Sequence, residues 1–252
     1  MDLLLLVHTL IGTALVAGGT NALNQLSERD VDARMRRTRG RPLPSGRVTP
    51  RRAGVFAAAI SVAGVAYLAL TVNLLTAALA ALTLVSYVFL YTPLKRRTSL
   101  NTLIGAVPGA LPIVGGWTAA GGPLGEAAVA LFWILFLWQL PHFLALAWIY
   151  REDYRAGGLV MLGVEDPTGR LTGRMTLLFA LALLPVSLAP TLLGITGWVY
   201  FVGALVLGVL YAVAGAALTA AVTDRRAWRL FSVSVIYLPV LLTLMVIDKL
   251  GA

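Results

Sequence analysis

Long apolar runs recur along this sequence and limit its fold more than any other feature. Eight of them can be counted, covering roughly residues 3–26, 53–72, 74–92, 102–119, 127–150, 173–193, 197–221 and 228–248. A run of about 20 apolar residues is long enough to cross the hydrocarbon core of a bilayer. Backbone polar groups in hydrocarbon must be satisfied within the segment, so each run is expected to be a helix. The sequence therefore predicts an all-α, polytopic transmembrane helix bundle that forms a single domain, residues 1–252.

The composition agrees with a membrane protein and excludes several kinds of chemistry. Only 12% of the residues are charged, against about 25% in a typical soluble domain. The chain has no cysteine, so disulfides, thiolate metal sites and cysteine nucleophiles are excluded. The Met1-Asp2 start lacks the basic region of a cleavable signal peptide, which predicts that the first apolar run stays as a membrane helix.

The positive charges are distributed very unevenly over the predicted loops. Nineteen of the 20 Lys and Arg residues fall in loops on one side of the eight alternating spans, and Lys249 is the exception. The positive-inside rule places these loops on the cytoplasmic side, with both termini on the other side. The distribution of the net charge of +9 therefore indicates membrane topology and a phosphate-bearing substrate, and argues against a nucleic-acid partner.

The first polar cluster follows the first span. Asn24, Glu28 and Asp32 are spaced i, i+4 and i+8 and would form one stripe on a helix, whereas Asp30 falls on a different face. Carboxylate and amide oxygens are the donors that Mg²⁺ prefers, and Mg²⁺ commonly bridges to phosphate. The alternative is that these acids only pair with neighbouring arginines.

The segment "RTRGRPLPSGR" places Arg37, Arg39 and Arg41 among glycines and prolines. Regularly placed guanidinium groups in a turn-rich segment can fold back over a phosphate. Attraction to anionic lipid also accounts for part of such a cluster.

Two further regions carry candidates for chemistry. His142 and Asp153 lie three helical turns apart and share a face if the helix continues, and an ionisable group inside a span is a functional candidate. His142 could equally bond to a neighbouring helix. The span 102–119 is rich in Gly and Pro, which suits either a hinge or a cavity for a bulky substrate.

Three segments resemble the UbiA superfamily of intramembrane prenyltransferases. They are "NALNQLSERDVDARMRRTRGRPLPSGR", "YTPLKRRTSLNTLIGAVPGALPIVGGWTA" and "WQLPHFLALAWIYREDYRAGGLVML". The acidic motif of that superfamily resembles N-D-x-x-D-x-x-x-D, and here Gln25 and Glu28 replace its first two Asp residues. The "PHF…REDY" pattern points to the branch that farnesylates heme. The family fold has nine transmembrane helices, and the eight predicted here lack the N-terminal one.

The resemblance implies a prenyltransferase reaction. Farnesyl diphosphate and heme B, with water, would give heme O and diphosphate. It implies a catalytic Mg²⁺ site, four diphosphate-binding cations and one tentative heme contact: Asn24, Glu28, Asp32 and Asp153 for the metal; Arg37, Arg41, Lys95 and Arg96 for diphosphate; His142 for heme. The implied partners are these substrates, the lipid bilayer and a downstream heme A synthase or terminal oxidase assembly. Alternatives are a UbiA-type enzyme with another aromatic or chlorin acceptor and, more distantly, a transporter, although a transporter of the inverted-repeat kind would show matching halves.

Overall fold

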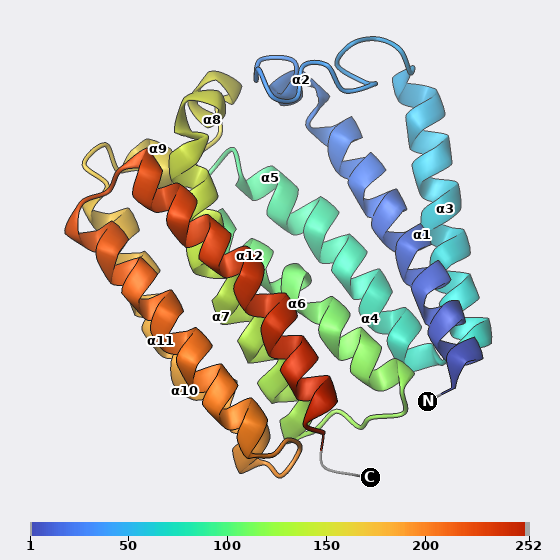
Figure 1. The fold of residues 1–252 in the computed structure, drawn as a ribbon. Coiled ribbons are helices and arrows are strands. Elements are labelled where there is room, and N and C mark those ends of the chain that lie inside the picture. The colour runs from blue at the N-terminus through green and yellow to red at the C-terminus, as the bar shows by residue number, and fades with distance from the viewer. Residues whose placement is uncertain (1, 250–252) are drawn as a thin grey trace. The chain divides into compact units, whose positions relative to one another are not determined.

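The computed structural model describes residues 2–249 (Figure 1). Its chain forms two compact units, Met1–Pro123 with Glu152–Met161, and Leu124–Arg151 with Leu162–Ala252. Nearly all of the described residues are helical, and one isolated β-bridge joins Thr196 to Lys249. The all-α prediction is confirmed, and each unit can be described by itself.

The eight predicted spans are also confirmed. Eight helical segments among the described residues are long and apolar enough to cross a membrane: Leu3–Ser27, Pro50–Thr71, Leu74–Leu94, Asn101–Ala119, Glu126–Ile149, Arg170–Leu192, Trp198–Ala220 and Asp224–Ile247. Three of them begin three or four residues before the predicted apolar run, because polar residues outside the run bond to their first turns. Thr49, for example, caps the second span by accepting from Arg52 N, and Pro50 follows in the first turn.

The first unit contains the first four spans. Its elements are α1 (Leu3–Ser27), α2 (Arg29–Asp32), α3 (Pro50–Thr71), α4 (Leu74–Val85), the π-helix η1 (Ser86–Tyr91), α5 (Thr92–Leu94) and α6 (Asn101–Ala119). Most of α8 (Arg151–Gly157) also belongs to this unit. Because α4, η1 and α5 follow one another without a break, they make the third span as a single helix with a π-helical stretch near its end.

Small residues allow α1 and α3 to pack closely, and the two helices lie side by side in Figure 1. Gly19 of α1 faces Ser61, where a Cβ would overlap the hydroxyl group. In return, Gly64 of α3 faces Val16, where a Cβ would lie 2.8 Å from a methyl carbon. Such contacts let helix backbones approach in a membrane, where packing replaces the hydrophobic effect between helices.

The second unit contains the other four spans. Its elements are α7 (Glu126–Ile149), α9 (Leu162–Glu165), α10 (Arg170–Leu192), α11 (Trp198–Ala220) and α12 (Asp224–Ile247). Within it, α7 packs against α10 and α12, and α11 packs against the same two helices. The buried Tyr200 and Tyr237 both bond to Ser187, through its carbonyl (2.8 Å) and its hydroxyl (2.6 Å), so their hydroxyl groups are satisfied in an apolar core.

The sidedness of the spans can be tested with single cysteines, because the chain has none of its own. Ser45 lies in the arginine-rich loop and Ala120 in the loop after α6, and both are exposed. The positive-inside rule predicts that a cysteine at position 45 reacts with an impermeant maleimide only from the cytoplasmic face, and one at position 120 only from the opposite face. Labelling of both from the same face would contradict the topology.

Candidate active site

The polar stripe of Asn24, Glu28 and Asp32, called the acidic stripe below, lies where the first span ends. α1 stops at Ser27, and Glu28 takes a non-helical conformation (φ −104°, ψ 11°) before α2 begins. Helical hydrogen bonds continue across this break, from Glu28 N to the Asn24 carbonyl (2.9 Å) and from Asp32 N to the Glu28 carbonyl (2.8 Å). Asn24, Glu28 and Asp32 are all buried. The register predicted from their spacing is therefore retained, although the helix is not continuous.

Glu28 is paired with a cation from the third span. Its Oε2 accepts from Lys95 Nζ (3.0 Å) and from Asn24 Nδ2 (2.9 Å). The side chains of Lys95 and Glu28 are only 12% and 8% exposed, so the ion pair is shielded from water. The other carboxylate oxygen, Oε1, is buried and has no hydrogen-bond partner among the described residues. The two carboxylate oxygens of Glu28 thus differ: Oε2 accepts from a cation and an amide, and Oε1 is buried without a donor among the described residues.

The π-helix η1 supplies the rest of this network. Thr92 Oγ1 accepts from Asn24 Nδ2 (3.1 Å) and donates to the Tyr87 carbonyl (2.9 Å). The rings of Tyr91 and Tyr87 lie 4.6 Å and 5.9 Å from Lys95 Nζ. Single π-helical turns are frequent at functional sites. The sequence reasoning missed Thr92 and Tyr87, although the spacing of Tyr87, Tyr91 and Lys95 repeats the i, i+4, i+8 pattern of the acidic stripe.

Asp32 is paired with the segment RTRGRPLPSGR, residues 37–47, which is called the arginine segment below. Arg41 Nη1 donates to Asp32 Oδ2 at 2.8 Å, and Thr38 Oγ1 donates to the Asp32 carbonyl at 3.0 Å. The guanidinium of Arg47 donates to the Gly40 carbonyl. These bonds fold the segment back onto the acidic stripe, and its predicted folding over a phosphate stays a prediction.

Asp153 anchors the start of the same segment. Its two carboxylate oxygens accept from the backbone N–H groups of Arg37 (3.2 Å) and Arg36 (3.4 Å). The guanidinium of Arg37 lies 5.8 Å from the Tyr154 ring. α8 is therefore docked on the arginine segment through both backbone and side chain, and the role of Asp153 as a metal ligand stays a prediction.

The helix does not continue unbroken from His142 to Asp153. α7 ends at Ile149, Tyr150 leaves the helical conformation (φ −103°, ψ 20°), and α8 begins a new helix at Arg151. The condition under which His142 and Asp153 would share a helix face is therefore not met.

Within the second unit, His142 makes the helix-to-helix bond that the sequence left open as an alternative. Its Nδ1 lies 2.7 Å from Ser234 Oγ of α12. The rings of Trp138 and Phe231 lie 5.1 Å and 4.9 Å from the imidazole. Heme contact by His142 stays a prediction.

Asp30 and Arg96 form a separate, exposed pair. Arg96 donates to both oxygens of Asp30, at 2.6 Å and 2.9 Å, and the Asp30 side chain is 56% exposed. The hydrogen bond from Arg96 lowers the pKa of Asp30 below its ordinary value, so Asp30 is ionised at neutral pH. This agrees with the expectation that Asp30 lies off the stripe. The guanidinium of Arg96 is bonded to Asp30 in this structure. Diphosphate binding by Arg96 stays a prediction.

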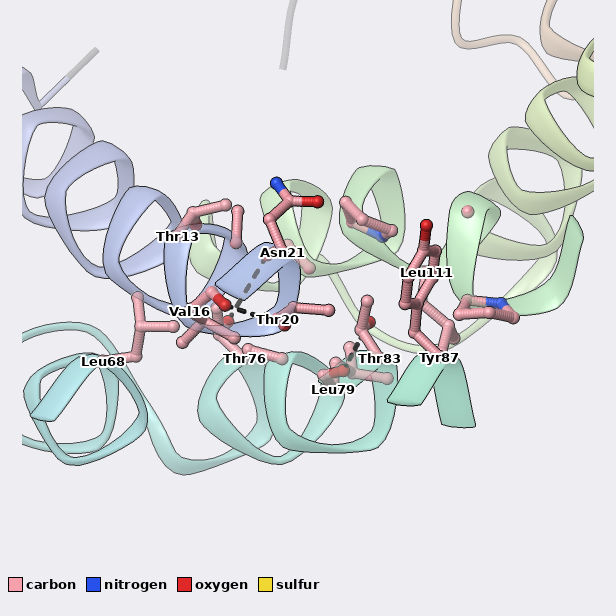
Figure 2. A pocket seen from close by; sticks show the side chains of 16 residues that line it. Thr13, Val16, Thr20, Asn21, Leu68, Thr76, Leu79, Thr83, Tyr87 and Leu111 are labelled. Atoms are coloured by element: carbon pink, nitrogen blue, oxygen red, sulfur yellow. Dashed lines mark hydrogen bonds between the residues drawn. The ribbon is translucent and has the colours of Figure 1, made fainter. Parts of the chain in front are cut away.

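An apolar cavity of about 230 Å³ lies among α1, α3, α4, η1 and α6. Figure 2 shows Thr13 and Leu68 at one end of it and Tyr87 at the other. Tyr87 is also the residue whose carbonyl is bonded to Thr92, so this end adjoins the network around Glu28. Five residues of the Gly- and Pro-rich span line the cavity: Pro108, Gly109, Leu111, Pro112 and Gly115. Of the two interpretations of that span, the structure favours the cavity.

The site as a whole is suited to an amphiphilic anion. Buried carboxylates, a lysine and arginines lie at the end of a membrane span, and an apolar cavity among the spans adjoins them through Tyr87. A diphosphate could bind to the cations and a metal ion, and its hydrocarbon chain could occupy the cavity.

Comparison with known proteins agrees with this class. The chain belongs to the UbiA prenyltransferase family, which matches residues 1–239. It is 51% identical over 251 residues to a protoheme IX farnesyltransferase of Solibacter usitatus (strain Ellin6076), covering 100% of this chain and 86% of that protein. It is 46% identical over 251 residues to a protoheme IX farnesyltransferase of Koribacter versatilis (strain Ellin345), covering 97% and 81%. This is a family of enzymes, so the transporter alternative is set aside.

Solved structures share the fold at low sequence identity. A digeranylgeranylglyceryl phosphate synthase matches with a TM-score of 0.82 and 18% identity, over 98% of this chain and 86% of that one. A UbiA homolog from Archaeoglobus fulgidus, bound to GPP and Mg²⁺, matches with a TM-score of 0.68 and 14% identity, over 97% and 89%.

The difference between the two neighbouring cations can be measured as stability. Lys95→Met removes the partner of a buried carboxylate and should cost about 3–5 kcal/mol of unfolding free energy. Arg96→Met, the matched control, breaks an exposed pair and should cost about 0–1 kcal/mol. Thermal unfolding in detergent measures both. Adding Glu28→Gln to Lys95→Met should restore part of the loss, and equal effects of the two single variants would contradict the burial argument.

Proposed function

We propose that the protein transfers the farnesyl group of farnesyl diphosphate to a vinyl group of heme B, with addition of water, giving heme O and diphosphate. The observation that carries this proposal is the likeness over the whole chain to proteins named protoheme IX farnesyltransferase. The arrangement of a charged site beside an apolar cavity supports it, because farnesyl diphosphate has one end of each kind.

The residues present fit a Mg²⁺ ion. Glu28 Oε1 is a buried carboxylate oxygen without a donor among the described residues, and Asn24 and Asp32 add oxygen atoms of the kind that Mg²⁺ takes. No group of three or more His, Cys, Asp or Glu residues in the described chain is placed to hold a metal. Mg²⁺ usually needs only one or two carboxylates together with substrate phosphates. We propose that Asn24, Glu28 and Asp32 hold it, where it would neutralise charge on the leaving diphosphate.

Lys95 and Arg41 are proposed to bind the diphosphate directly. Each of them pairs with one carboxylate of the stripe, so each already lies where a diphosphate bound to that stripe would be. Arg37 is proposed as a further ligand, since Asp153 fixes the backbone of its segment. Guanidinium groups suit phosphate because they donate two parallel hydrogen bonds.

In the chemical step, the bond between farnesyl C1 and the diphosphate oxygen breaks, and its electron pair leaves with the diphosphate. The heme vinyl group attacks the allylic cation through its terminal carbon, and water adds to the resulting cation beside the porphyrin and releases a proton. The apolar cavity keeps water from the first cation. The cations near Glu28 and Asp32 stabilise the charge that develops on the leaving group.

The remaining assignments are also part of the proposal. His142 is the candidate contact for heme. The protein is placed in a bacterial plasma membrane with the basic loops in the cytoplasm, and a heme A synthase or a terminal oxidase assembly would use the product.

Turnover tests the reaction and the stripe together. Purified protein with farnesyl diphosphate, heme B and Mg²⁺ should give heme O, detected by mass spectrometry, and EDTA should abolish it. Glu28→Gln and Asp32→Asn should each lower turnover about 10²-fold or more, because each removes charge from the leaving-group site. Asp30→Asn, an acid of the same segment off the stripe, should stay within a few fold. No heme O from the wild type would refute the proposed function. Equal losses of turnover at all three positions would refute the proposed catalytic role of the acidic stripe.

The role of Asp153 can be tested by measuring the KM for farnesyl diphosphate and the requirement for Mg²⁺ separately. If Asp153 acts only as an anchor of the arginine segment, Asp153→Asn should raise the KM for farnesyl diphosphate about tenfold and leave the Mg²⁺ concentration for half-maximal rate unchanged. Glu152→Gln is the matched control, because Glu152 pairs with the exposed Arg155 in the same helix. A rise in the Mg²⁺ requirement of Asp153→Asn would show instead that Asp153 is a metal ligand.

A further inference from the structure

We propose that Leu68, resting on Gly12, sets the length of the prenyl chain that the cavity accepts. The inference rests on the proposed function, because it treats the cavity beside Glu28 as the binding site of the prenyl group. It goes further by assigning the choice between prenyl diphosphates of different length to one contact between α1 and α3.

The direction of a bound chain follows from the two unlike ends of the cavity. Tyr87 lies at the end near the charged network, and Thr13 and Leu68 lie at the other end (Figure 2). The lining residues of α1 extend from Asn21 to Thr13, about 12 Å at a rise of 1.5 Å per residue. A prenyl group with its diphosphate at Glu28 therefore points its last isoprene unit toward Leu68.

Leu68 is held firmly at this end. It is fully buried, and it packs with Val16 and Ala77 in a small hydrophobic cluster. It is the one residue of α3 among those that line the cavity in the described chain.

Gly12 determines how far Leu68 stays out of the cavity. A Cβ added at Gly12 would lie only 2.5 Å from both Cγ and Cδ2 of Leu68. The isobutyl group therefore occupies the space that the missing side chain of Gly12 leaves. An alanine at position 12 would push Leu68 off this place, and the adjoining open space is the cavity.

Two substitutions should thus change the cavity in opposite directions. Leu68→Ala removes three carbon atoms from its far end and should favour geranylgeranyl diphosphate. Gly12→Ala displaces Leu68 into the same end and should favour geranyl diphosphate. A difference of one small apolar group in a pocket typically changes selectivity by about 10-fold or more.

The experiment compares kcat/KM for geranyl, farnesyl and geranylgeranyl diphosphate with heme B and Mg²⁺, using the full chain in detergent. Relative to farnesyl, we expect Leu68→Ala to raise the geranylgeranyl ratio about tenfold and Gly12→Ala to raise the geranyl ratio about tenfold. The matched controls are Leu70→Ala, whose side chain on α3 is 87% exposed, and Gly18→Ala, where a Cβ would meet only Ile60, at 3.5 Å. Both controls should keep the wild-type ratios.

The outcomes separate this inference from the proposed function. If the wild type transfers no prenyl group to heme, the proposed function is refuted. If it transfers farnesyl but the ratios of Leu68→Ala match those of Leu70→Ala, the chain does not end at Leu68 and the inference is overturned. Thermal unfolding checks that each variant is folded. If Leu68→Ala is not, the milder Leu68→Val together with Gly12→Ala decides the question by the same ratios.

Discussion

The need to neutralise two buried carboxylates, Glu28 and Asp32, organises the first unit of this protein. Removing such a group from water costs several kcal/mol unless a cation and hydrogen bonds compensate it. Lys95 compensates Glu28 and Arg41 compensates Asp32. One cation comes from the end of the third span and the other from the loop after α2, so the first unit must bring both segments to the end of α1. The ordered arginine segment and its anchor at Asp153 follow from the same requirement.

The π-helical stretch shows how the third span meets this requirement. The N–H and the hydroxyl group of Thr92 both bond to the Tyr87 carbonyl, five residues earlier, in place of the usual four. Thr92 Oγ1 also accepts from Asn24. Next to it, Tyr91 packs against Gly105, where any Cβ would overlap the ring. The wider turn therefore lets one short stretch of chain line the cavity with Tyr87, bond to the stripe with Thr92 and support the ammonium group of Lys95 with aromatic rings.

Much of this could be predicted from the sequence, where the controlling physics is local. The spans follow from the lengths of apolar runs, and the stripe follows from a spacing that backbone hydrogen bonds preserve through the break at Glu28. The partners of Lys95 and Arg96 could not be predicted, because adjacent cations look alike in sequence and only tertiary packing gives one a buried acid and the other an exposed one. The fifth span ends where its apolar run predicts, at Ile149, but whether the helix continues to Asp153 was left open, because the local sequence carries no clear helix stop. Asp153 meets Arg37 from 116 residues away, which no local pattern reveals.

The two carboxylate oxygens of Glu28 have different partners, and this difference bears on the order of events in the proposed reaction. Its Oε2 takes both donors, from Lys95 and Asn24, whereas Oε1 takes none among the described residues. A second cation can therefore approach Oε1 while Lys95 still holds Oε2, so the carboxylate is never left buried without compensation. If Lys95 binds the diphosphate as proposed, it would turn from Glu28 over the rings of Tyr87 and Tyr91, which favour a cation above them. In the proposed reaction, the contacts that stabilise the site without substrate would also guide the ammonium group to the leaving group.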